Sequence, residues 1–111
     1  MSISETAGNY HAARKGNCAQ SVVAGYAEVT GQKGELIDEM KKCGGGNAPE
    51  GYCGALYAAM VIVGDEKKDK CVEMFKAQAQ GCSKCKEIRP NAIIPCNQCV
   101  RVAGKCIEDL M

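Results

Sequence analysis

The sequence contains no tryptophan, one phenylalanine and four tyrosines among its 111 residues. So few aromatic side chains argue against a surface that stacks the bases of single-stranded nucleic acid. An excess of one charge is missing too, because 14 Lys and Arg stand against 13 Asp and Glu and leave a net charge of +1. Nucleic-acid binding normally needs a basic patch or stripe. This balance therefore gives no electrostatic reason to expect nucleic acid or an acidic membrane as a partner.

Targeting and membrane segments are also missing from the pattern. The first residues, MSISETAGNYHAARKGN, are polar and contain no apolar core of the kind a signal peptide needs. The longest apolar stretch, Ala55–Val63, is about half as long as a membrane span. We therefore expect a cytoplasmic protein, in a compartment where disulfides are rare.

Cysteine is the residue in excess, at nine of 111 positions. In a chain without secretion signals, paired cysteines are more often metal ligands or redox centres than structural disulfides. The odd number would also leave at least one thiol outside a fully paired disulfide framework. We therefore expect the chemistry of this chain to depend on its thiols.

Helical patterns dominate the chain, and no segment alternates as a strand would. Asn17 predicts an N-cap for a helix that continues to Thr30–Gly31. A cysteine-rich segment is expected over residues 82–89. We predict one all-α domain of residues 1–111, a small bundle of about five helices with a cysteine-rich C-terminal loop. The other expected helical ranges are 4–15, 34–42, 49–64, 65–81 and 97–110.

The cysteines fall into different settings along these helices. Cys18, Cys53 and Cys96 lie at or near predicted helix starts, where unpaired N–H groups and the helix dipole stabilise thiolates. Thiolate is the form that binds metals and attacks disulfides. Cys71 and Cys106 instead lie on apolar stripes inside helices, so we expect them to be buried packing residues.

Two C-x-x-C pairs, Cys82/Cys85 and Cys96/Cys99, follow one another with ten residues between them. The spacing lets both sulfurs of a pair face one ion, so the four thiolates predict a metal or cluster site. The gap is shorter than in a zinc ribbon, and the bacterial ferredoxin pattern C-x-x-C-x-x-C is missing. Zinc and iron therefore both stay open as metals, and a thiol–disulfide oxidoreductase is a further alternative.

Other motifs are few. His11 is the single histidine, and we expect a surface or capping role for it rather than a part in nucleophilic catalysis. The glycines at 44–46 lead toward Cys53 without the Lys-Ser/Thr ending of a phosphate-binding loop. The charged run Glu66–Lys70 is expected to be a solvated helix face.

Several segments, taken in order, resemble the C_GCAxxG_C_C family. They are residues 17–22 (NCAQSV), the glycines 44–46, residues 53–58 (CGALYA), Cys85 and Cys96. That family is described as redox-active and is named for its four spaced cysteines, which correspond here to Cys18, Cys53, Cys85 and Cys96. Related sequence occurs in split-Soret cytochromes c. Ala58 stands where the motif has its last glycine, and Cys43, Cys82 and Cys99 are additional to it.

The resemblance implies an iron–sulfur protein for electron transfer or redox sensing, with Cys18, Cys53, Cys85 and Cys96 as cluster ligands. It also implies a redox partner protein. The chain lacks a C-x-x-C-H motif, so no c-type haem is expected. The alternative cofactor is a structural zinc ion, for which the paired motifs offer Cys82, Cys85, Cys96 and Cys99. A core this small is also compatible with a homodimer.

Overall fold

The computed structural model describes residues 2–31, 34–43, 53–78 and 96–110, and within these ranges the chain is helical without strands. Two short elements, α3 (Leu36–Glu39) and the 3-10 helix η1 (Met40–Cys43), lie between longer helices. The predicted all-α bundle is confirmed. Its five long helices are α1 (Ile3–Ala12), α2 (Cys18–Thr30), α4 (Gly54–Val63), α5 (Lys68–Gln78) and α7 (Cys96–Leu110).

Local capping interactions set the start of α1 and both ends of α2. The Ser2 side chain accepts a hydrogen bond from the N–H of Glu5 at the start of α1. Asn17 and Gln20 form a reciprocal capping box at the start of α2. Gly31 ends α2 in the left-handed conformation, with φ 74°. Helix α2 therefore has the predicted bounds.

The predicted helix over residues 34–42 is only partly formed. Helix α3 covers four residues, and the chain then tightens into η1. The side-chain amide of Asn17 donates hydrogen bonds to the carbonyl oxygens of Met40 (3.2 Å) and Lys41 (2.8 Å). These carbonyls thus have a tertiary partner, and the segment is held against the start of α2 rather than continuing as one regular helix.

Helix α4 begins later than predicted. Cys53 is its N-cap with non-helical backbone angles, φ −54° and ψ 130°, so the helix starts at Gly54 and not near Pro49. Helices α2, α5 and α7 all pack against α4, and most of its side chains are buried. Tyr57 and Met60 are only partly buried. Within the described ranges no helix combines the length and the apolarity that a membrane crossing requires.

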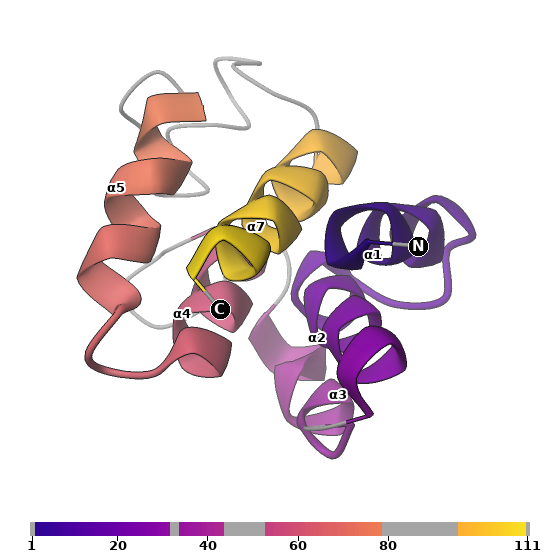
Figure 1. The fold of residues 1–111 in the computed structure, drawn as a ribbon. Helices are drawn as coiled ribbons and strands as arrows, with labels where there is room; N and C mark the ends of the chain where they lie inside the picture. Colours follow the sequence, from indigo (N-terminus) through magenta and orange to yellow (C-terminus); the bar gives the residue numbers. More distant parts are fainter. Residues whose placement is uncertain (1, 32–33, 44–52, 79–95, 111) are drawn as a thin grey trace.

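Helix α7 contacts α1, α2, α4 and α5, and Figure 1 shows it running between α5 and α1 in front of α4. Its approach to α1 depends on Gly104, where an added Cβ would lie 2.7 Å from the Cα of Ser4. Gly25 of α2 plays the same part against Ala7 of α1, also at 2.7 Å. The helices share one apolar core whose largest fully buried side chains include Phe75, Leu56, Ile107, Val22, Val23 and Val100.

Candidate functional site

Three helices of the bundle begin at or beside a cysteine. Cys18 is the first residue of α2, Cys53 is the N-cap of α4, and Cys96 is the first residue of α7. The N–H groups of a first helical turn lack intrahelical partners and carry partial positive charge. All three cysteines therefore stand at or beside helix starts, as predicted.

The surroundings of Cys53 lower the pKa of its thiol. Only 6% of the residue is exposed. A hydrogen bond from the Cys99 thiol lowers the pKa of Cys53 to about 7, against the opposing effect of burial. The N–H groups of Leu56 and Ala55 in the first turn of α4 lower it further, although the thiol makes no regular capping hydrogen bond. Cys53 is therefore about half ionised near neutral pH.

Cys99 reaches Cys53 from the first turn of α7. It is 3% exposed and belongs to the same buried cluster as Cys53. The contact joins the starts of α4 and α7, two helices that are far apart in sequence and packed together in the fold. We refer to these two residues as the α4/α7 thiol pair.

A second pair of thiols joins α5 to α7. Cys71 and Cys106 are 0% and 3% exposed, which confirms the prediction that both are buried. They are also hydrogen-bonded to each other, which raises the pKa of Cys71 and lowers that of Cys106. We refer to Cys71 and Cys106 as the α5/α7 thiol pair. None of the four paired thiols is in a disulfide.

Polar contacts hold the start of α7 against the end of α1. The Asn97 amide donates to the carbonyl oxygen of Gly8 at 3.0 Å and lies 3.2 Å from Nδ1 of His11. Burial lowers the pKa of His11, which favours the neutral ring that accepts this bond. Nε of Arg101 donates to Oδ1 of Asn97 at 3.1 Å. The start of α7 is thus held against the end of α1, and His11 is a half-buried partner in this contact.

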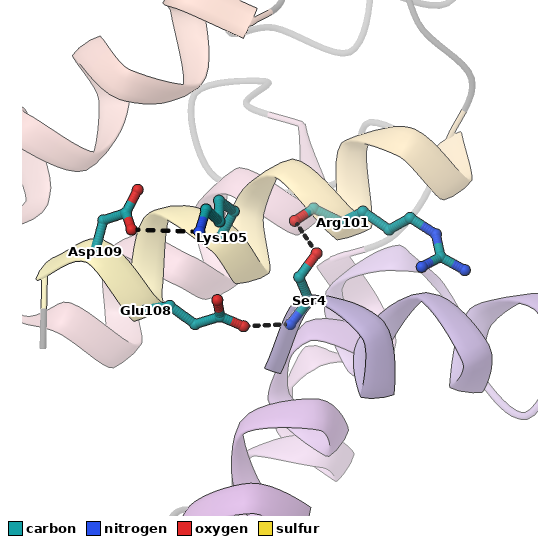
Figure 2. A network of polar contacts seen from close by, with 5 residues as sticks. All are labelled: Ser4, Arg101, Lys105, Glu108 and Asp109. Atoms are coloured by element: carbon teal, nitrogen blue, oxygen red, sulfur yellow. Dashed lines mark hydrogen bonds and ion pairs between the residues drawn. The ribbon is translucent and has the colours of Figure 1, made fainter. Parts of the chain in front are cut away.

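A second set of contacts fixes the rest of α7 along α1. Figure 2 shows Ser4 between Arg101 and Glu108: its hydroxyl donates to the Arg101 carbonyl oxygen and its N–H donates to the Glu108 carboxylate, both at 2.8 Å. Lys105 and Asp109 form an ion pair at 3.7 Å on the exposed side of the helix. Exposed pairs of this kind contribute little. Ser4 therefore holds the middle and end of α7, as Asn97 holds its start.

Comparison with protein-family models, with curated proteins and with solved structures found nothing similar. The family resemblance therefore depends on the cysteine and glycine motifs alone, and the functional argument depends on the chemistry of the thiols.

The two predicted ligand sets are only partly within the described residues. Cys82 and Cys85 lie outside them, as do the glycines at 44–46, and Cys96 is placed only by its backbone. Cys18 is half-buried and packs against the core. Within the ranges that the structure describes, no three His, Cys, Asp or Glu side chains are grouped as a metal would require. The contact that the structure does contain joins Cys53 of the cluster set to Cys99 of the zinc set.

The sequence alone did not predict which thiols contact each other in the two pairs. Residues 53 and 99, and residues 71 and 106, are too far apart in the chain for any local spacing rule. Asn97 and Arg101 were also missed as residues that position α7, although an Asn at a helix start is a recognisable signal. Helix periodicity places the thiols on buried faces, and only packing decides which faces meet.

Proposed function

We propose that this chain is a redox protein that works through thiolates at helix starts, and that it binds an iron–sulfur cluster through Cys18, Cys53, Cys85 and Cys96. The observation that carries the proposal is the place of Cys53, a buried thiol at the start of α4 whose pKa is lowered to about 7 by the hydrogen bond from Cys99. Cluster iron binds thiolate and not thiol. A cluster supplies one-electron transfer at a potential set by its ligands and surroundings.

The two proposed ligands whose side chains the structure describes, Cys18 and Cys53, have surroundings that suit an iron–sulfur cluster. Cys18 and Cys53 each lie at the start of a helix, where N–H groups offset the negative charge of thiolates and sulfides. Cys53 is buried, and the apolar core around it would restrict the access of water to a redox centre. The hydrogen bond from Cys99 would then act from outside the ligand set, as a donor to a ligand sulfur.

A second function is favoured by the contact between Cys53 and Cys99. Two thiols within hydrogen-bond reach form a dithiol that can be oxidised to a disulfide with release of two protons and two electrons. In exchange with a disulfide of a partner protein, the Cys53 thiolate attacks one sulfur and the Cys99 thiol resolves the mixed disulfide. The partner leaves as a dithiol that holds both electrons and both protons. The zinc alternative has less support, because Cys99 of the zinc ligand set is hydrogen-bonded to Cys53, which lies outside that set.

The deciding experiment is anaerobic purification followed by measurement of iron, zinc, acid-labile sulfide and the visible spectrum. Iron with labile sulfide supports the cluster. Zinc without colour would contradict it in favour of the paired C-x-x-C motifs. Metal-free protein after attempted reconstitution would also contradict it and leave the dithiol function.

Two matched variants sharpen this result. Cys53→Ser is expected to lose iron and sulfide, because it removes a proposed ligand. Cys99→Ser is expected to keep both, with a shifted potential, because Cys99 only donates a hydrogen bond. Loss of iron in Cys99→Ser and its retention in Cys53→Ser would refute the proposed ligand set.

A further inference from the structure

A cavity of about 600 Å³ opens beside the α5/α7 thiol pair, which the proposed function does not use. Its volume is within the range of small-molecule binding sites. Met74 of α5 and Val102 of α7 give it an apolar wall, and Arg101, Lys105 and Asp109 line it as well. Cys106 also lines the cavity, so one member of the thiol pair can be reached from it.

The two thiols differ in access. Cys71 is 0% exposed, is not part of the cavity lining and lies against Cys106. Figure 1 shows α5 and α7 as neighbouring helices. The hydrogen bond between Cys71 and Cys106 joins the two. A reagent in the cavity therefore meets Cys106 first, with Cys71 as the thiol behind it.

The charged side chains at the cavity are already paired. Among the described lining residues, Lys105 and Asp109 carry opposite charges and form an ion pair at 3.7 Å. The Arg101 guanidinium lies instead against Gly8 and donates through Nε to Asn97. The reagent is therefore defined here by its reactive sulfur and its size, and not by a charge.

We propose that Cys71 and Cys106 form a second redox centre, in which Cys106 exchanges with a small disulfide in the cavity and Cys71 resolves the product. Glutathione disulfide represents this chemical class. The inference is independent of the proposed function, because it uses other cysteines and requires no metal.

The exchange balances in two steps. In the first, the Cys106 thiolate attacks one sulfur of the small disulfide, an S–S bond forms to the protein, and one small thiolate leaves. In the second, the Cys71 sulfur attacks Cys106, the protein disulfide forms, and the second small thiolate leaves. The two protons of the protein thiols end on the two small thiols, so the reagent is reduced by two electrons and the protein is oxidised by two.

The acidities of the two thiols agree with this order. The hydrogen bond from Cys71 lowers the pKa of Cys106, while Asp109 and burial oppose that effect. The same contact and burial raise the pKa of Cys71. The thiolate is therefore favoured on the sulfur that lines the cavity, and the proton on the sulfur behind it.

Tryptic peptide mapping tests the proposal on the full-length, unmodified chain. Cleavage after Lys70 and Lys76 isolates Cys71 in residues 71–76, and cleavage after Lys105 isolates Cys106 in residues 106–111. Each peptide contains a single cysteine, so their linked mass identifies the pair. Reduced protein is equilibrated with a glutathione redox buffer, quenched with acid, alkylated and digested.

We expect the linked peptide to become the main form of both cysteines as glutathione disulfide increases, and to disappear with dithiothreitol. If both cysteines are alkylated in full at every buffer ratio, the proposal is wrong. Linkage of either cysteine mainly to another partner would overturn it as well. Iron and sulfide content tests the proposed function separately, so the two ideas can fail independently.

Two serine variants test the assigned order of attack. Cys71→Ser removes the resolving thiol and is expected to accumulate glutathione on Cys106. Cys106→Ser removes the attacking thiol and is expected to leave Cys71 free of glutathione. Glutathione on Cys71 in Cys106→Ser, at the level seen on Cys106 in the other variant, would refute the assignment. Far-ultraviolet circular dichroism checks that each variant keeps its helices, and the mapping of the unsubstituted protein holds even if one does not fold.

Discussion

The acidity of Cys53 leads to the sharpest prediction, on reduced, metal-free protein. Its pKa is lowered from 9.0 to about 7, and the hydrogen bond from Cys99 is the largest cause. This difference corresponds to about 3 kcal/mol in favour of the thiolate. In Cys99→Ala that bond is lost while burial remains, so we expect the pKa of Cys53 to rise by at least about one unit. The ionised fraction at pH 7 then falls from about half to below about a tenth.

The same lowering makes stability depend on pH. The folded pKa of Cys53 lies below the unfolded value, so its thiolate stabilises the fold fully above pH 9, and this stabilisation is lost as the pH falls through about 7. Between these limits the free energy of unfolding should change by up to about 3 kcal/mol. Urea unfolding at several pH values, with the dependence measured for Cys53→Ala subtracted, isolates this contribution.

The direct assay is the rate of iodoacetamide alkylation at Cys53 against pH, followed by mass spectrometry. The midpoint of the rate profile reports the pKa. Cys106→Ala is the matched control, because it removes a buried thiol from the same helix without touching Cys53, and its midpoint should stay near 7. An unchanged midpoint in Cys99→Ala, or an equal shift in the control, would refute the reasoning.

Three further predictions concern the free energy of unfolding. Asn17→Ala removes a cap and two tertiary hydrogen bonds, and should lower the free energy of urea unfolding by about 1–2 kcal/mol. Gly104→Ala places a Cβ 2.7 Å from α1 backbone and should cost about 1–3 kcal/mol, whereas Gly34→Ala, with 3.9 Å of clearance, should change stability by less than about 1 kcal/mol. Oxidation of Cys71 and Cys106 closes a loop of about 35 residues and should raise the free energy of unfolding by about 4 kcal/mol; no change in the urea midpoint would contradict this value.

Local chemistry explains which parts of the fold the sequence could predict. The bounds of α2 follow from Asn17 and Gly31, whose cap roles depend only on neighbouring residues. The segment after it could not be predicted equally well, since the carbonyls of Met40 and Lys41 bond to a side chain more than 20 residues earlier. The start of α4 at Gly54 was also missed, because the pattern from Pro49 onward contains no strong cap signal.

The candidate site divides in the same way. That Cys18, Cys53 and Cys96 stand at helix starts is a local property, and the sequence predicted it. That Cys53 meets Cys99 is a tertiary property, set by the packing of α4 on α7. Cys71 is the instructive case. An apolar stripe predicts its burial correctly but cannot show that the residue across the contact is another thiol.

The two thiol pairs have a common geometric origin in α7. Cys99 and Cys106 are seven residues apart, so they lie on one face of the helix, about two turns or 10 Å from each other. The partner residues come from α4 and α5, which follow one another in the chain. Cys53 precedes α4, and Cys71 lies in the first turn of α5. Because α4 and α5 form a helical hairpin, the starts of these two helices are separated by about the length of the hairpin. Helix α7 runs along that hairpin, so it meets Cys53 near its own start and meets Cys71 two turns later. The two thiol pairs are therefore separate within one core.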